Sequence, residues 1–517
     1  MGHSVPAIAN SAIVIAYLVA MLAFGWWGKS RTKDSADYLV AGRRLGPLLY
    51  TGTMAAVILG GASTVGGVGL GYKFGISGAW LVIAIGTGVF VLSVFFAGTI
   101  QRLRVYTVAQ MLTLRYGNRA TQFSSVIMLA YTLMLCATST GAYATIFVVL
   151  FGWDRWVAIV IGGIIVVVYS TVGGMWSITL ADQVQFVIKT VGVFLLMLPF
   201  SMHSAGGLGA MRERLDASFF SWTSIGTQTI ITYFVVYTLG ILIGQDIWQR
   251  VFTARTPQVA RWGGISAGVY CVLYGIAGAM IGMAARVALP EIDVARLGKD
   301  AVYAEVATNL LPMILGGIVL AAAVAAMMST SSGALIAAAT VARTDVWPPI
   351  ARWLGRRSDG AATPGVAAGT VDTTAEDDVA QDRYWVLALG LCVVGIAIVV
   401  TDVVAALTIS YDILVGGLLV AILGGMLWKR GTGVGATWAM ATGSIATLGT
   451  MAVIAVQRRD FMEGVLANEP IYYGLGVSLV VYVVVSLLTP PTDPAVAAAW
   501  RARLQGEPDG TPVGTEA

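Results

Sequence analysis

The sequence is poor in charged residues. Only 11% of its 517 residues are Asp, Glu, Lys or Arg, whereas 57% are hydrophobic, and the mean hydropathy is +0.81. This composition is typical of a polytopic membrane protein. The net charge of +4 is spread over many short loops and forms no basic face, which excludes nucleic acid as a partner.

Cysteine and histidine are also scarce. The three cysteines, Cys136, Cys271 and Cys392, lie in separate apolar runs, and their spacing fits neither a disulfide framework nor a zinc site. The two histidines, His3 and His203, form no ligand cluster. The sequence shows no P-loop signature and no nucleophile–base pair, so we expect a protein that is not an enzyme and does not hydrolyse ATP.

Long apolar runs, in contrast, are abundant. Thirteen are long enough to cross about 30 Å of hydrocarbon, at residues 7–27, 47–72, 78–99, 120–150, 156–173, 182–202, 225–250, 264–289, 309–342, 384–401, 403–428, 434–456 and 471–489. The first follows MGHSVP, which lacks the basic start of a signal peptide, so we expect a true span there.

Basic residues predict the orientation. They follow the first, third, seventh, ninth and eleventh runs, as in Lys29, Arg31, Arg102, Arg250, Arg352 and Lys429. Since basic loops stay in the cytoplasm, we expect the N-terminus outside and the C-terminus inside, in the inner (plasma) membrane. The polar loop 358–383 is expected to be disordered.

One apolar run contains a ridge of small hydroxyl residues. Within residues 323–343, Ser329, Thr330, Ser331 and Ser332 follow one another. Hydroxyls offer oxygen ligands to a hard cation without placing another charge in hydrocarbon, so this pattern indicates a sodium site. The alternative is that the hydroxyls bond to their own helix or to a packed neighbour.

The second run has six glycines between residues 54 and 72. Glycine at this density loosens a helix. If the helical ladder opens at Gly60 and Gly61, the carbonyls of Ala56 and Leu59 lose their partners, and freed carbonyls at membrane depth line a cavity or bind a ligand. With the hydroxyl ridge they would make a five-oxygen cage for sodium. Close helix packing through small residues is the alternative.

Several motifs together resemble the sodium:solute symporter family, which includes bacterial proline, pantothenate, sialic acid and sugar symporters. They are the glycine-broken second run ending in GYKFG, YSTVGGMWSITLADQVQ at 169–185, GQDIWQRVFTARTPQVAR at 244–261, MMSTSSGAL at 327–335 and LWKRGTGVGA at 427–436. The resemblance runs from about residue 10 to 490. It implies an all-α polytopic membrane protein with about 13 transmembrane helices, built as a LeuT-like 5+5 inverted repeat with discontinuous helices.

The same resemblance implies a division of the chain. Residues 1–46 would hold an extra N-terminal helix and a cytoplasmic loop, 47–202 the first five-helix repeat, 203–428 the second repeat, 429–490 two C-terminal helices, and 491–517 a flexible cytoplasmic tail. We expect the protein to function as a monomer.

Ion ligands carry over from the family to particular positions. The main sodium site falls on the carbonyls of Ala56, Leu59 and Ala326 and the hydroxyls of Ser329 and Thr330. A second sodium site would use Asp182 and Ser332, but the position of its other hydroxyl is Gly333.

Substrate positions differ from those of well-known relatives. Contacts of the proline symporter fall on Thr238, Leu242 and Asp246, and contacts of sugar symporters fall on Ala62, Ser63 and Thr408. Asp412 lies one helical turn from Thr408 and is a candidate partner for an amino or ammonium group, or else a structural hydrogen-bonding residue. Asp246 is expected to pair with Arg250, four residues further on.

Lys189 is an unusual charge for an apolar run. It lies seven residues after Asp182, on the same helical face and about 10 Å deeper. Pairing with Asp182 is the favoured interpretation. The alternatives are that it binds a substrate carboxylate or takes the place of the cation in a proton-coupled variant.

These observations predict a secondary active transporter. It would carry a small organic solute, such as an amino acid or a carboxylate, into the cell with sodium by alternating access. Its partners would be the solute, Na+ and the lipid bilayer. The alternatives are a proton-coupled transporter of the same fold and a symporter-like membrane sensor.

Overall fold

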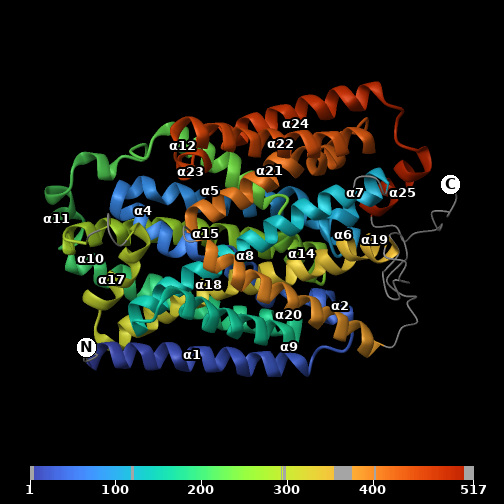
Figure 1. Ribbon diagram of the computed structural model, residues 1–517. Helices are drawn as coiled ribbons and strands as arrows, with labels where there is room; N and C mark the ends of the chain where they lie inside the picture. The colour runs from blue at the N-terminus through green and yellow to red at the C-terminus, as the bar shows by residue number, and fades with distance from the viewer. Residues whose placement is uncertain are drawn as a thin grey trace.

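The computed structural model describes residues 5–117, 121–292, 294, 298–353, 375–400 and 403–505. Within these residues the regular structure is helical, apart from one isolated bridge between Leu45 and Ala254. The long helices run side by side across the molecule (Figure 1). Ten helical stretches of the described chain are long and apolar enough to cross a membrane, or eleven if one bent pair counts as a span.

The first half of the chain is an almost continuous series of helices. In order they are α1 (Val5–Lys29), α2 (Ser35–Val40), α3 (Pro47–Ile58), η2 (Ala62–Gly66), α4 (Gly67–Phe74), η3 (Gly75–Ala79), α5 (Trp80–Val91), η4 (Leu92–Phe96), α6 (Ala97–Leu103), α7 (Val108–Tyr116), α8 (Thr121–Phe151), α9 (Arg155–Thr190), η6 (Val191–Met197), α10 (Leu198–Ser204) and α11 (Gly207–Arg214).

The second half continues in the same way. Its helices are α12 (Thr227–Tyr233), η8 (Phe234–Thr238), α13 (Leu239–Ile241), α14 (Gln245–Thr253), α15 (Pro257–Ala288), α17 (Val302–Asn309), α18 (Met313–Val341), η10 (Ala342–Val346), α19 (Trp347–Trp353), α20 (Ala375–Val399), α21 (Val403–Leu427), α22 (Gly433–Arg458), α23 (Phe461–Val465), α24 (Glu469–Leu488) and α25 (Pro494–Gln505). Within the described residues, all thirteen apolar runs therefore coincide with helical segments, and the number of separate spans stays a prediction.

Two glycines break helical stretches that each hold more than one apolar run. Gly75 (φ 67°, ψ −146°) ends α4, and Gly174 (φ 57°, ψ −144°) interrupts α9. A residue other than glycine rarely adopts a positive φ. A Cβ at Gly174 would also lie 2.6 Å from atoms of Tyr38 in α2. These glycines let successive runs take different directions without a long loop.

Helix α18 lies at the centre of the bundle. Residues 319–342 are all buried, and α18 packs against α8, α9, α1 and α3. In the most apolar 18 residues of the stretch Met313–Trp353, 78% of the residues are buried. In the corresponding part of α24, which lies at the periphery, only 28% are buried (Figure 1). Alanine and serine make this close approach of helices possible. The hydroxyl ridge therefore faces protein on every side.

Two segments expected to lack structure are partly helical. Of the loop 358–383, residues 358–374 lie outside the described residues, but 375–383 belong to α20. There Asp378 pairs with Arg343 of η10 at 2.8 Å, and Asp382 pairs with the same guanidinium. Of the tail 491–517, α25 packs against α6 and α7 and buries Trp500. Ion pairing and one buried aromatic ring order these segments, which composition alone did not indicate.

Candidate functional site

The second apolar run is broken where its glycines indicate. Helix α3 ends at Ile58, and the π-helical turn η2 begins at Ala62. Between them Leu59 (φ −88°, ψ 73°) forms an inverse γ-turn, in which Gly60 N donates to Ile58 O at 3.1 Å. The N–H of Gly60 is thus directed away from Ala56 O, its partner in a regular helix.

Side chains of two other helices satisfy carbonyls at this break. Lys189 Nζ of α9 donates to Ala56 O at 2.9 Å and to Leu59 O at 3.4 Å. Thr330 Oγ1 of α18 donates to Val57 O at 2.6 Å. Because unpaired backbone groups are costly in a membrane, these contacts stabilise the broken conformation.

The hydroxyl ridge lies directly against the break. A Cβ built on Gly60 would be 2.6 Å from Thr330 Oγ1, and a Cβ on Gly61 would be 2.5 Å from Ala142 Cβ of α8. Only glycine leaves room for this approach. The structure thus brings together the two segments on which the predicted ion site depends.

Replacing Gly60 with Ala is expected to destabilise the protein by about 1–3 kcal/mol, since the new methyl group must displace Thr330 in a packed interior. The midpoint of thermal unfolding in detergent measures the change. Gly476→Ala in α24 is the control, because nothing lies within 4 Å of that added Cβ and alanine is the better helix former. An equal midpoint for Gly60→Ala and the wild type would contradict this packing.

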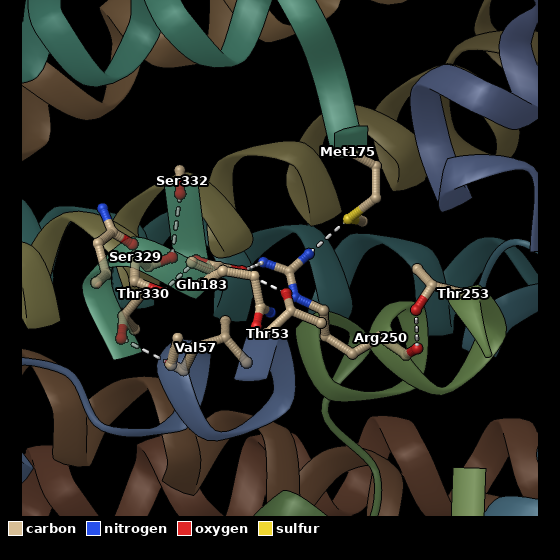
Figure 2. Close-up of polar contacts among 12 residues, drawn as sticks. Thr53, Val57, Met175, Gln183, Arg250, Thr253, Ser329, Thr330 and Ser332 are labelled. Carbon is tan, nitrogen blue, oxygen red and sulfur yellow. Dashed lines mark hydrogen bonds and ion pairs between the residues drawn. The ribbon is translucent and has the colours of Figure 1, made fainter. Parts of the chain in front are cut away.

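Asp182 of α9 is the centre of a buried polar cluster. It accepts hydrogen bonds from Thr53 of α3 and from Ser329 Oγ of α18, the latter at 2.6 Å. It also pairs with Arg250 Nη2 of α14 at 3.2 Å, and neither side chain of this pair is exposed. Figure 2 shows Arg250 reaching from α14 toward Thr53, with Met175 on the other side of its guanidinium. Four elements thus meet at one carboxylate.

Neither of two expected ion pairs, Asp246 with Arg250 and Asp182 with Lys189, is formed, and each of the basic side chains has another partner. Arg250 pairs with Asp182 and not with Asp246, which accepts a hydrogen bond from Tyr131 at 2.9 Å. Lys189 donates to the α3 carbonyls and not to Asp182, whose oxygens are taken by the cluster. Sequence spacing could not reveal these pairings because they join different helices.

The five residues predicted for the main sodium site lie together, namely Ala56, Leu59, Ala326, Ser329 and Thr330. Their oxygens, however, are engaged by protein groups. The first two carbonyls hold Lys189, and Ala326 O accepts from Thr330 at 3.4 Å. The hydroxyls donate to Asp182 and to Val57 O. In this conformation the oxygens do not fit an open cage for sodium.

The two residues predicted for a second sodium site are also engaged by protein groups. Asp182 is paired with Arg250, and Ser332 Oγ donates to Ser329 O of its own helix at 3.1 Å. A Cβ at Gly333 would be 3.1 Å from Arg250 Nη2 and 2.5 Å from a methyl group of Val57. The space that a hydroxyl side chain would need at position 333 is therefore filled by Val57 and the guanidinium of Arg250.

A cavity of about 270 Å³ lies next to the break, on its η2 side. Three of the six predicted substrate residues line it, namely Ala62, Thr408 and Asp412. Asp412 is 2% exposed, and its Oδ1 has no hydrogen-bond partner among the described residues. Aromatic rings of Tyr233 and Tyr237 form part of the wall. The cavity therefore combines a mostly apolar lining with one buried carboxylate and with Lys299, whose ammonium group is paired with Asp300 at 2.9 Å.

The other three predicted substrate residues do not line this cavity. Ser63 Oγ donates to Gly60 O at 3.1 Å, and Thr238 Oγ1 donates to Ala84 O at 2.6 Å. Leu242 is buried, and its carbonyl accepts from Trp248 at 2.8 Å. All three stabilise local packing in this conformation.

Three residues of the site were not predicted from sequence: Thr53, Val57 and Arg250. Thr53 lies one helical turn before Ala56 and Val57, so the α3 face that ends at the break carries a polar side chain. Arg250 follows Gln249 in a helix that also contains Gln245 and Asp246, so the sequence did not indicate its buried partner on α9.

Comparisons with known proteins agree with this geometry. A family model described as "Sodium:solute symporter family" matches residues 38–359. The osmoregulated proline transporter OpuE of Bacillus subtilis is 29% identical over 39% of this chain and 42% of its own length. The sodium/glucose cotransporter 4 of Danio rerio is 25% identical over 66% of this chain and 58% of its own length. The high affinity choline transporter 1 of Homo sapiens is 25% identical, over 52% of this chain and 49% of its own.

A solved structure shows the fold. The structure of a Na+-coupled sialic acid symporter superposes with a TM-score of 0.73 at 18% identity, covering 94% of this chain and 99% of that one. The predicted all-α, LeuT-like class is confirmed, and the protein is a multi-pass membrane protein. The chain spans about half the length of the curated relatives it matches. It belongs to the sodium:solute symporter family.

Proposed function

We propose that this protein is a secondary active transporter that couples uptake of a small organic solute to sodium. The observation that carries the proposal is the broken α3. Its carbonyls face the hydroxyl ridge of α18, and three residues after Leu59 the same segment lines the solute-sized cavity with Ala62. A change in ion binding at the break therefore acts directly on the cavity wall. Membership of the family and the fold shared with a Na+-coupled symporter support this function.

The cavity favours a small solute with an ammonium group. Its volume of about 270 Å³ is at the low end for ligand sites. Asp412 offers a buried carboxylate whose charge an ammonium group would balance. Relatives are named as transporters of proline, choline and monocarboxylates. We propose an amino acid or a related amine as the solute.

Sodium and the solute are coupled because both bind best to the same conformation of the protein. Sodium and solute bind from outside, stabilise the outward-open conformation, and leave inward when the two repeats, residues 47–202 and 203–428, rock against each other. The basic loops support an outward N-terminus and a cytoplasmic C-terminus. We propose that one protomer suffices, because cavity and break belong to the same bundle.

Purified protein in liposomes provides the test. A thermal-shift screen of amino acids and amines with and without sodium identifies the solute, since a ligand that binds the folded state raises the unfolding midpoint. Uptake of that solute is then measured with an inward sodium gradient or with potassium in its place. Sodium-driven accumulation supports the proposal. Uptake that is equal in potassium would refute sodium coupling, and binding without any flux would favour a sensor.

Replacing Ser329 and Thr330 together with Ala is expected to lower sodium-driven uptake at least tenfold, because two candidate ion ligands and the Thr330–Val57 contact are lost. Ser331→Ala is the matched control on the same helix, since Ser331 faces Cys136 and Thr140 of α8. Amounts of each variant in the membrane are compared by immunoblot. Sodium dependence of the double variant identical to the wild type would count against the assignment.

A further inference from the structure

Lys189 makes a buried contact that is unusual for a lysine. Its side chain is fully buried, and its ammonium group lies 2.9 Å from Ala56 O and 3.4 Å from Leu59 O. We name these two oxygens the carbonyl pair. Both belong to the break after α3, and both are ligands that family resemblance gives to sodium. The ammonium group of Lys189 therefore occupies the place where a sodium ion is expected.

An ammonium group and a sodium ion satisfy the same need of the carbonyl pair. Each brings a single positive charge to carbonyl dipoles that the broken helix leaves without N–H partners. Both cannot bind the same two oxygens at contact distance, because like charges repel strongly in a buried site. The carbonyl pair holds one cation at a time.

The buried charges around the break also favour a single cation at the carbonyl pair. Asp182 and Arg250 form a neutral pair, and Asp246, a further buried carboxyl on α14, also acts on Arg250. Lys189 adds +1, which is the charge that a sodium ion would add in its absence. On α15, Cys271 is a further ionisable group that acts on Lys189, while α18 carries none and Tyr50 is the only one on α3. A sodium ion in addition to Lys189 would place two positive charges at the carbonyl pair.

We propose that Lys189 is a tethered cation that competes with sodium for the carbonyl pair. Sodium binds there only when the side chain of Lys189 withdraws, and removal of the lysine opens the site to the free ion. This inference refines the ion site of the proposed function and rests on it for the location of that site. It also explains why the predicted five-oxygen cage is closed in this structure.

The test compares sodium binding by the full-length purified protein and its variants. The midpoint of thermal unfolding is measured over a series of sodium concentrations, with N-methylglucamine keeping the ionic strength constant. Lys189→Met keeps an unbranched apolar side chain and removes the charge. Lys189→Arg keeps the charge, and Lys73→Met removes an exposed lysine as the control.

The proposal predicts that Lys189→Met is half-saturated at a sodium concentration at least tenfold lower than the wild type. Lys189→Arg and Lys73→Met should both respond to sodium as the wild type does. Adding Ser329→Ala and Thr330→Ala to Lys189→Met should abolish the gained response, which would locate the ion at the break.

Two results would overturn the proposal. One is equal half-saturation by sodium in the wild type and Lys189→Met. The other is a Lys189→Met protein that stays unstable in sodium and in N-methylglucamine alike, because Lys189 would then be only a structural cap for the broken helix. A variant that is unstable in N-methylglucamine but recovered by sodium supports competition.

Uptake by the same variants separates this inference from the proposed function. If the wild type shows no sodium-driven uptake but Lys189→Met gains it, sodium coupling of the wild type fails while competition is upheld. If the wild type is sodium-driven and Lys189→Met has the same sodium dependence, the proposed function is upheld and competition fails.

Discussion

Asp182→Asn is expected to destabilise the protein by about 3–5 kcal/mol. The substitution keeps the shape of the side chain but deprives the buried guanidinium of Arg250 of the carboxylate that contacts it. It also weakens hydrogen bonds from Thr53 and Ser329, which join α3 and α18 to α9. The midpoint of thermal unfolding in detergent, together with the fraction of monodisperse protein, measures the effect.

A second substitution shows whether charge is the cause. In Asp182→Asn/Arg250→Met both charges of the pair are removed together, so the double variant should recover much of the lost stability. Glu463→Gln is the matched control, because Glu463 and Arg458 form an ion pair that is half exposed, and such pairs contribute at most about 1 kcal/mol. A single variant as stable as the wild type, or a double variant no better than the single one, would show that the pair is not structurally important.

Asp412→Asn is expected to weaken binding of the solute by about 10–100-fold. A charge-assisted hydrogen bond to a buried carboxylate contributes about 1.5–3 kcal/mol, and the neutral amide cannot replace its charge. Isothermal titration of the purified variant with the solute found in the thermal-shift screen gives the change in affinity.

An analogue without the amino group provides the control for this prediction. Its affinity should be the same for Asp412→Asn and for the wild type, since it makes no ion pair. The ligand-free variant should unfold at a higher temperature, because a buried carboxylate that forms no ion pair within the described part of the chain is unfavourable and the amide is neutral. Unchanged affinity for the ammonium solute would remove Asp412 from the site.

The fold could be predicted largely from local sequence. All thirteen apolar runs coincide with helical segments, and the glycines at positions 60 and 61 mark the break in the second. Local signals suffice here because a membrane requires each segment to satisfy its own backbone groups. The helical parts of 375–383 and of the tail could not be predicted, since they depend on Arg343 and on a surface formed by α6 and α7.

The candidate site could be predicted only in part. The approach of Gly60 to Thr330 follows from small residues on both helices, and their pattern is visible in the sequence. The partners of Lys189 and Arg250 were not visible. A long cationic side chain reaches across to other helices, so its partner depends on the relative rotation of those helices, which hydrophobic periodicity does not specify.

The movement of labelled sodium driven by the solute tests the central claim of coupling most directly. Liposomes that contain the purified protein hold equal sodium concentrations inside and outside, and an inward gradient of the solute is imposed. Because coupling is reciprocal, labelled sodium should accumulate inside while the solute gradient lasts, and Ser329→Ala/Thr330→Ala should abolish this accumulation. Liposomes that take up the solute while sodium moves independently of it would contradict the account.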